Sequence, residues 1–235
     1  MRIAGFEPLT LIDYPNHLAT IVFTPGCALR CPYCHNPELI TAVPGSRSEF
    51  FIVNHEDEFF DFLKTRLGLL EGVVITGGEP TLHLDLLDFI HRVKDLGFLV
   101  KLDTNGIFPD KVKAILATGL VDYWAMDIKH SPEKYPLASG VKIPIERFRQ
   151  SVKLLMNSGV PYEFRTTVVP SIHESEDFLE IGKWIAGAQN YYLQAFRPIK
   201  IADTTLIDRI GEKSLDLKAI RKSMLPYINS IDIRE

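Results

Sequence analysis

The sequence predicts an α/β fold built mainly from parallel strands. Six short segments rich in Val, Ile, Phe and Tyr alternate along the chain with longer segments that have helical periodicity. Strand–helix units of this kind favour parallel strands joined by right-handed crossovers. A doubly wound open sheet and a (β/α) barrel both fit this order. A full barrel has eight units and the chain shows six, so any barrel would be a partial one.

The predicted strands are short apolar runs, and prolines punctuate the segments that follow them. Pro80, Pro109 and Pro170 interrupt the pattern after the second, third and fifth strands. In chain order the predicted strands are Leu18–Thr24, Gly72–Thr76, Phe98–Asp103, Val121–Ile128, Tyr162–Val169 and Tyr191–Phe196.

The predicted helices fill the intervals between these strands and follow the last one. In the second of them, Leu84, Leu87 and Ile90 fall on one face at helical spacing. In chain order the predicted helices are Glu56–Leu67, Leu84–Leu96, Asp110–Thr118, Ile145–Ser158, Glu174–Ala186 and Asp216–Tyr227.

The remaining segments are expected to be loops or to extend the sheet. Residues 3–15 are expected to pack against the first strand, and residues 130–144, rich in Pro, Ser and Lys, to form a long loop. No repeat, low-complexity tract or linker divides the chain. We therefore predict a single domain over residues 1–235, with residues 1–17 as an N-terminal extension.

Composition limits the classes of function. The 235 residues carry a net charge of −4, which does not favour a nucleic-acid or membrane-surface partner. The first residues, Met1–Glu7, lack the apolar region of a signal peptide, and no apolar run reaches membrane-spanning length. The cytoplasm is therefore the expected compartment.

The three cysteines are grouped in one short loop after the first predicted strand. They are Cys27, Cys31 and Cys34, and the chain has no others. Their spacing is C-x3-C-x2-C, with Tyr33 directly before the last one. One alternative is a zinc site with His35 or His17 as the fourth ligand, but a second cysteine pair is missing. Three thiolates on a [4Fe–4S] cluster would instead leave one iron without a protein ligand.

This motif resembles the signature of the radical S-adenosylmethionine (SAM) enzymes. The resemblance implies that the amino and carboxylate groups of SAM bind the open iron. The reduced cluster would then cleave the sulfonium and release a 5′-deoxyadenosyl radical.

Further motifs are similar to those of the activases of glycyl radical enzymes. They are Ile12–Pro15, Thr24–Gly26 before the first cysteine, and His35–Glu38 after the last one. Within this group the chain most resembles the activating protein of anaerobic ribonucleotide reductase. With the resemblance, the fold is predicted to be a partial (β/α)6 barrel similar to a TIM barrel.

Thr76-Gly77-Gly78-Glu79-Pro80 follows the second predicted strand. Read alone, it could be a tight turn with an acidic helix cap. The glycines could also let the backbone approach a ligand, and the carboxylate could accept hydrogen bonds from an ammonium group. The segment is similar to the family motif that receives the SAM amino group, which implies that Gly77, Gly78 and Glu79 bind SAM.

Charged and polar residues end the third and fourth predicted strands. Asp103 and Thr104 could form an Asx-type turn, and Asp127 and Lys129 an ordinary ion pair at the sheet edge. Polar groups at the carboxyl ends of parallel strands meet at one edge. Resemblance to formate-lyase activases implies that all four lie near the SAM carboxylate or a nearby cation.

The last candidates are arginine and aromatic residues. Arg165 in the fifth strand could point inward to an anion such as the SAM carboxylate, or outward to a surface partner. The resemblance implies that Tyr33 and His35 face the adenine, although His35 could simply cap a turn. Gln194 and Arg197, on and after the sixth strand, are further candidates to border the adenine.

The chain departs from the activase pattern at two positions. Asn16 stands where the pattern usually has Gly, in a loop expected to face the partner. A histidine that some activases place after the sixth strand has no clear match near Arg197.

The resemblance implies that the chain generates a glycyl radical on a partner enzyme. The expected partner is anaerobic ribonucleotide reductase, and the expected electron donor is a flavodoxin or ferredoxin. Two alternatives are a pyruvate formate-lyase type of activase and a radical SAM enzyme that acts on a small molecule. A third is a regulatory module that binds a cluster or zinc and has no catalytic activity.

Overall fold

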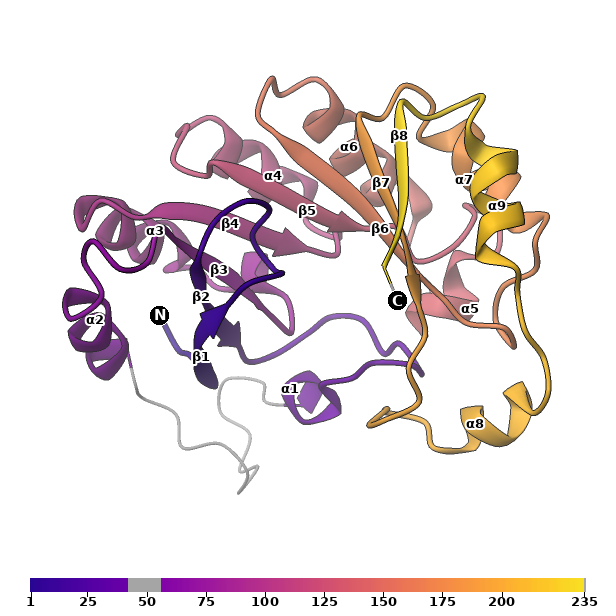
Figure 1. Cartoon of the computed structure of the whole chain (residues 1–235), viewed down its shortest axis with the longest axis horizontal. Coiled ribbons are helices and arrows are strands. Elements are labelled where there is room, and N and C mark those ends of the chain that lie inside the picture. The colour runs from indigo at the N-terminus through magenta and orange to yellow at the C-terminus, as the bar shows by residue number, and fades with distance from the viewer. Residues whose placement is uncertain (42–55, 235) are drawn as a thin grey trace. The chain divides into compact units, whose positions relative to one another are not determined.

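The computed structural model describes residues 1–41 and 56–234 and confirms the predicted α/β fold (Figure 1). Strand order in the sheet follows chain order from β1 to β8. A doubly wound sheet would reverse this order part-way, so the order favours the barrel type of arrangement. The strands are β1 (Gly5–Thr10), β2 (Ala19–Thr24), β3 (Gly72–Gly77), β4 (Leu99–Thr104), β5 (Tyr123–Asp127), β6 (Tyr162–Val168), β7 (Asn190–Ala195) and β8 (Ser230–Arg234).

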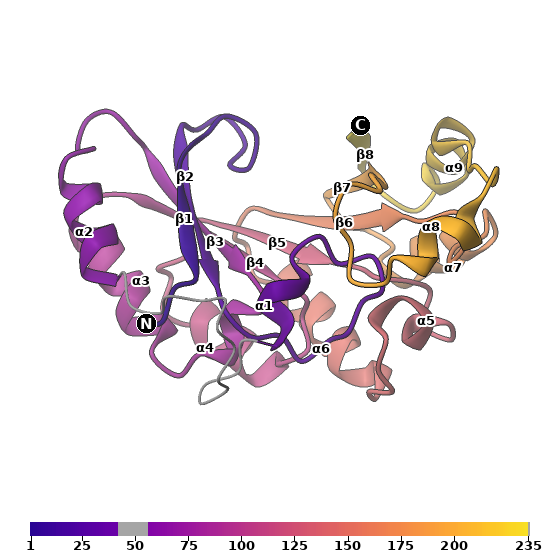
Figure 2. The ribbon, with the colours of Figure 1, turned by 90° about the horizontal axis from the view of Figure 1, so that it is seen from below.

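Four strand pairs are parallel, and the pair at the N-terminal edge is antiparallel. The pairs β2–β3, β3–β4, β6–β7 and β7–β8 are parallel, as the strand–helix alternation predicts. β1 pairs with β2 in antiparallel orientation (Figure 2), which confirms that residues 3–15 pack against the first predicted strand. β8 was not predicted and adds a strand beyond the six expected units.

The six predicted helices are confirmed, and each ends one to three residues before its predicted C-terminal end. They are α2 (Glu56–Lys64), α3 (Leu86–Asp95), α4 (Pro109–Leu116), α6 (Ile145–Met156), α7 (Asp177–Trp184) and α9 (Leu217–Met224). Short helices that sequence periodicity did not reveal are α1 (Pro37–Thr41), the 3-10 helix η1 (Pro80–Leu82), α5 (Tyr135–Ser139) and α8 (Thr205–Ile210). The prediction of an uninterrupted loop over residues 130–144 is therefore wrong, because α5 lies inside it.

The chain forms two compact units, and each combines two separate stretches of sequence. The first comprises Met1–Ala28 with Glu38–Trp124, and the second Leu29–Pro37 with Ala125–Glu235. In the first unit, α3 packs on β4. Phe59 of α2 stacks on Phe89 of α3 at 5.8 Å between ring centroids. Both rings are buried and form part of the apolar core of this unit.

The strands of the second unit have one apolar face and one polar face. Phe164, Tyr191 and Leu193 are buried, and α9 packs on β7 and β8. The residues that alternate with them include Glu163, Arg165 and Tyr192, which contact one another or Arg234 of β8. The polar face therefore carries the charged side chains of these strands. In the part of the chain that the structure describes, no helix has the length and apolarity to span a membrane.

Candidate functional site

Cys27 lies in the first unit, in the loop that follows β2. Two main-chain hydrogen bonds fix Gly26, the residue before it. Gly26 N donates to the Leu39 carbonyl at 2.7 Å, and Glu79 N donates to the Gly26 carbonyl at 2.8 Å. The side-chain amide of Asn105, which follows β4, donates to Cys27 Sγ at 3.6 Å. A donor to sulfur favours the ionised thiol, which is the form that binds metal.

Cys31 and Cys34 lie in the second unit, where main-chain hydrogen bonds hold their loop. Cys34 N donates to the Cys31 carbonyl at 3.1 Å, and Ala202 N donates to the Cys34 carbonyl at 3.0 Å. Cys31 Sγ lies 3.9 Å from the Ser139 carbonyl oxygen, to which it donates. Burial raises the pKa of the Cys31 thiol to about 11. This thiol therefore stays protonated near neutral pH unless a cation stabilises the thiolate.

The chemistry of the three thiols fits an iron–sulfur cluster. All three cysteines are free rather than disulfide-bonded. Across residues 1–41 and 56–234, no three His, Cys, Asp or Glu side chains are grouped to bind a single metal ion. His35 bonds to the Arg197 carbonyl and His17 to Glu71, so each alternative zinc ligand has one ring nitrogen engaged by another partner. In a [4Fe–4S] cluster each thiolate binds a different iron, so the three cysteines need not be grouped around a single metal ion. The metal-binding roles of the cysteines remain predictions.

The Gly-Gly-Glu segment at the end of β3 packs tightly against the chain after β2. A Cβ atom on Gly78 would lie 2.0 Å from the Gly26 carbonyl oxygen, and one on Gly77 2.3 Å from Thr24 N. Gly77 also has a φ of +117°. No other residue fits these two positions without displacing main chain. The glycines are therefore required by packing within the first unit, whether or not a ligand approaches them.

Glu79 is fully buried, and its carboxylate is engaged by its own surroundings. Oε1 accepts from Thr81 N at 3.1 Å, from the Thr81 hydroxyl, and from the Thr104 hydroxyl at 2.8 Å. Oε2 accepts from Asn105 N at 2.7 Å. Burial raises the pKa of Glu79, although these hydrogen bonds favour the ionised form. Glu79 thus ties the end of β3 to the end of β4, and its contact with the SAM ammonium group remains a prediction.

Asp103 is paired with a buried lysine that sequence analysis did not identify. Lys101 lies two residues before it on β4, is almost fully buried, and places Nζ 2.5 Å from Asp103 Oδ1. The Thr76 hydroxyl donates to Asp103 Oδ2 at 3.2 Å. Strand alternation puts residues 101 and 103 on the same face of the strand, which could have suggested the pair.

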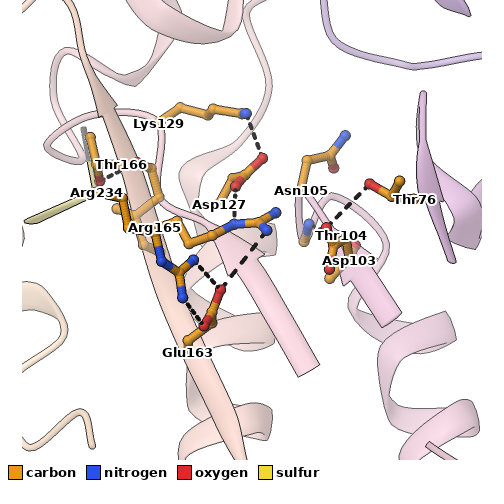
Figure 3. A network of polar contacts seen from close by, with 12 residues as sticks. Thr76, Asp103, Thr104, Asn105, Asp127, Lys129, Glu163, Arg165, Thr166 and Arg234 are labelled. Atoms are coloured by element: carbon orange, nitrogen blue, oxygen red, sulfur yellow. Dashed lines mark hydrogen bonds and ion pairs between the residues drawn. The ribbon is translucent and has the colours of Figure 1, made fainter. Parts of the chain in front are cut away.

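Asp127, Lys129 and Arg165 form a connected charged group in the second unit (Figure 3). Lys129 Nζ lies 2.7 Å from Asp127 Oδ2, and Arg165 Nε lies 3.0 Å from Asp127 Oδ1. Burial opposes the ionised form of Asp127, but the two positive charges outweigh it and hold the pKa of this carboxyl well below its ordinary value. Burial likewise opposes the charged form of Lys129, but Asp127 holds the lysine pKa well above its ordinary value. The group therefore stays fully charged across the physiological pH range.

Glu163 and Arg234 extend this charged group, and sequence analysis identified neither. Glu163 is fully buried on β6, two residues before Arg165. Arg234 on β8 binds both of its carboxylate oxygens at 2.8 Å. β8 was not predicted, so the sequence offered no reason to place Arg234 near β6.

Tyr33 and His35 differ in their surroundings. Tyr33 is buried, its ring centroid lies 5.9 Å from Lys129 Nζ, and its hydroxyl has no hydrogen-bond partner among the described residues. Burial raises the pKa of this phenol well above its ordinary value, so the hydroxyl remains a donor. His35 is exposed, donates from Nε2 to the Arg197 carbonyl at 2.8 Å, and stacks on Phe196. The imidazole therefore holds the chain after β7, and contact of either ring with adenine remains a prediction.

Some of the predicted site residues are connected within each unit, whereas Asp103 pairs with Lys101 and His35 bonds to the Arg197 carbonyl. In the first unit, Glu79 bonds to Thr104 and Asn105, and Asn105 bonds to Cys27. In the second unit, Asp127 forms ion pairs with Lys129 and Arg165, and the Tyr33 ring lies beside Lys129.

Comparison with known proteins gives consistent matches in sequence. The family model described as the radical SAM superfamily matches residues 21–185. A protein of Methanocaldococcus jannaschii, classed by its name with the glycyl-radical enzyme activating enzymes, is 30% identical over 99% of this chain and 95% of its own length. The pyruvate formate-lyase-activating enzyme of Clostridium pasteurianum is 30% identical over 75% of this chain and 72% of its own length.

A solved structure supports the fold. SuiB of Streptococcus suis bound to S-adenosylmethionine superposes with a TM-score of 0.65 and 16% identity. The match covers 92% of this chain and 52% of the SuiB chain, so this chain spans about half the length of that protein.

Proposed function

This chain belongs to the radical SAM superfamily, and we propose that it activates a glycyl radical enzyme. Members of this superfamily are enzymes that use a [4Fe–4S] cluster and SAM, and this chain is an enzyme with these two cofactors. The observation that carries the proposal is its similarity, along nearly the whole chain, to a protein named as an activase of this kind.

Cys27, Cys31 and Cys34 would hold the cluster through three thiolates. When bound, the cluster would supply the one electron that cleaves a C–S bond of SAM into methionine and a 5′-deoxyadenosyl radical, which would take a hydrogen atom from glycine and become 5′-deoxyadenosine. The protein's own contribution is to position SAM and to exclude water around the radical. No side chain has to act as an acid or a base in this scheme.

We assign the binding of SAM to residues of both connected groups. In the first unit the candidates are the Gly77–Glu79 segment, Asp103 and Thr104. In the second unit, Lys129 and Arg165 supply positive charge for a carboxylate, and Asp127 fixes both cations. The Tyr33 hydroxyl is a buried donor that a polar ligand would satisfy. Contacts of His35, Gln194 and Arg197 with adenine complete the proposal.

We propose anaerobic ribonucleotide reductase as the partner and a flavodoxin or ferredoxin as the electron donor. The motifs around Ile12–Pro15 and His35–Glu38 support this choice of partner. Similarity to a pyruvate formate-lyase-activating enzyme supports the alternative partner. The cytoplasm is the proposed compartment, because free cysteines persist where thiols are kept reduced.

Anaerobic activation tests the proposal. The cluster is rebuilt, reduced and mixed with SAM and either anaerobic ribonucleotide reductase or pyruvate formate-lyase from the same organism. We expect a glycyl radical doublet in the electron paramagnetic resonance spectrum of the reductase sample. A doublet only with the lyase would reassign the partner. Cleavage of SAM with neither doublet would contradict the activase function and favour a small-molecule substrate.

A further inference from the structure

A line of alternating charges crosses three strands of the second unit (Figure 3). It runs from Asp127 on β5 through Arg165 and Glu163 on β6 to Arg234 on β8. Arg165 belongs to the proposed SAM site, whereas Glu163 and Arg234 are not among the residues proposed to bind SAM. Glu163 and Arg234 therefore contribute to the electrostatic surroundings of Arg165, which is proposed to bind SAM.

The Arg165 guanidinium lies between two carboxylates that hold it unequally. Its Nε donates to Asp127 Oδ1 at 3.0 Å, which is a hydrogen bond. Its Nη1 lies 3.9 Å from Glu163 Oε1, which is an ion pair too long for a hydrogen bond. Arg165 is thus bonded toward Asp127 and only attracted toward Glu163.

Arg234 is the second partner of Glu163 and is bonded to it more closely than Arg165 is. Its two terminal nitrogens each donate to one oxygen of Glu163 at 2.8 Å, in the paired geometry that suits a guanidinium and a carboxylate. Its Cζ lies 3.4 Å from the ring centroid of Tyr192, so the guanidinium also stacks on an aromatic face. Both carboxylate oxygens of Glu163 are therefore bonded to Arg234, including Oε1, which is the oxygen that forms the long ion pair with Arg165.

We propose that Arg234 is a positioning residue for the SAM site, because it holds Glu163 and so keeps that carboxylate from drawing Arg165 away from Asp127. This inference rests on the proposed role of Arg165 in binding SAM.

Loss of Arg234 would leave Glu163 as a buried carboxylate without its main partner. With Arg234 in place the Glu163 side chain is only 1% exposed, and a buried carboxylate that loses its partner is strongly destabilised. Arg165 is a neighbouring cation, and a shift of about 1 Å would bring its Nη1 within hydrogen-bond distance of Glu163. That shift would weaken the bond between Arg165 and Asp127 and displace the guanidinium from the site.

The alternative is that Arg234 only anchors β8 to the sheet. The two roles differ in what a second substitution does. If Arg234 acts by restraining the charge of Glu163, then Glu163→Gln removes the attraction and corrects the Arg234→Ala defect. If Arg234 only anchors β8, then Glu163→Gln can restore stability by removing an uncompensated charge, but none of these variants changes the bond between Arg165 and Asp127.

The experiment measures SAM affinity by equilibrium dialysis on the reconstituted full chain. The variants are Arg234→Ala, Glu163→Gln, the double variant, and Arg221→Ala as the control. Arg221 also bonds to β8, through the Ile231 carbonyl, but lies exposed on α9. In the protein without cofactors, nuclear magnetic resonance of the Arg165 Nε–H group reports the bond to Asp127, and thermal unfolding reports stability.

We expect Arg234→Ala to weaken SAM binding about tenfold or more and to shift the Arg165 Nε–H signal, while Arg221→Ala changes neither. We expect the double variant to bind SAM more tightly than Arg234→Ala and to restore the signal. Equal affinity of Arg234→Ala and wild type, or a double variant as weak as Arg234→Ala, would overturn the inference. If Arg234→Ala does not fold, Arg234→Gln takes its place with the same expected order. Failure of the wild-type protein to bind SAM would instead overturn the proposed function.

Discussion

At the scale of single residues, Glu79 illustrates how a motif residue can serve the fold and the site together. Two of its four hydrogen bonds, from Thr104 and Asn105, join the ends of β3 and β4, and the two from Thr81 cap η1. A loss of SAM affinity after its substitution would therefore not prove direct contact with SAM. Stability has to be measured beside affinity.

We expect Glu79→Gln to lower the free energy of unfolding of the cofactor-free protein by about 1–3 kcal/mol. The amide would turn an NH2 donor toward groups that are themselves donors, such as Asn105 N. Urea unfolding measures the change. The control is Glu212→Gln, at an exposed residue, which should stay within about 0.5 kcal/mol of wild type. A Glu79→Gln protein as stable as the control would contradict this account of the loop.

Asn16 shows that a departure from a motif can preserve backbone shape. Its φ is +64°, in the left-handed region where Gly is easily placed and Asn is better tolerated than other residues. The activase pattern usually has Gly here, so the turn keeps the conformation that the pattern implies. We expect Asn16→Gly to retain stability and Asn16→Val to lose about 1–2 kcal/mol in urea unfolding, since a branched side chain opposes this conformation. Equal stability of the two variants would contradict the assignment.

Sequence predicted candidate site residues at the ends of strands and within motifs, and it missed the residues that contact these candidates from distant parts of the chain. Asp127, Lys129 and Arg165 were predicted and are joined in the structure. Glu163 and Arg234 are 71 residues apart and pair only because β8 lies in the same sheet as β6. Local spacing carries no information about such a pair.

At the scale of elements, two histidines connect the loops that follow β5 and β6. His130 Nε2 donates to the Ile172 carbonyl at 3.1 Å, and His173 Nε2 donates to the Lys129 carbonyl at 2.9 Å. Their rings stack at 4.7 Å. Each Nδ1 accepts a main-chain N–H, so both rings must be neutral. The pair thereby holds the main chain of Lys129 in place.

This pair predicts loss of stability in acid. Burial lowers the pKa of His173 from 6.5 to about 4, and burial also lowers the pKa of His130. The unfolded chain therefore binds protons that the folded chain excludes. The stabilisation is complete above pH 6.5 and is lost as the pH falls toward 4. Asp177, which lies 3.6 Å from His130, has a pKa below its ordinary value and titrates below this range.

We expect His173→Gln to flatten the dependence of unfolding free energy on pH between pH 4.5 and 6.5, by up to about 1.4 kcal/mol per pH unit. Urea unfolding at a series of pH values measures the slope. His91→Gln, at an exposed position of α3, is the control and should keep the wild-type slope. An unchanged slope in His173→Gln would show that this ring does not exclude a proton.

Periodicity predicted the long elements and missed the short ones for a physical reason. A helix of five residues such as α5 makes little more than one turn, so an apolar spacing can repeat only once along it, as from Tyr135 to Ala138. Ser230–Arg234 does alternate polar and apolar residues, but five residues at the edge of the sheet give only a weak signal.

At the scale of the whole molecule, strand order resolves what periodicity left open. The six strand–helix units fitted both a doubly wound sheet and a partial barrel, and strand order in chain sequence favours the second. The match of the superfamily model to residues 21–185 agrees with this fold. A single domain over residues 1–235 remains a prediction, because the residues group into two compact units that each have many internal contacts.

The central claim is that Cys27, Cys31 and Cys34 hold a [4Fe–4S] cluster in this chain. The most direct measurement is iron, sulfide and zinc content after anaerobic reconstitution, in the wild type and in Cys34→Ser. The account predicts about four irons and four sulfides per wild-type chain, and loss of both in the variant. One zinc per chain, or iron content that does not depend on Cys34, would contradict it.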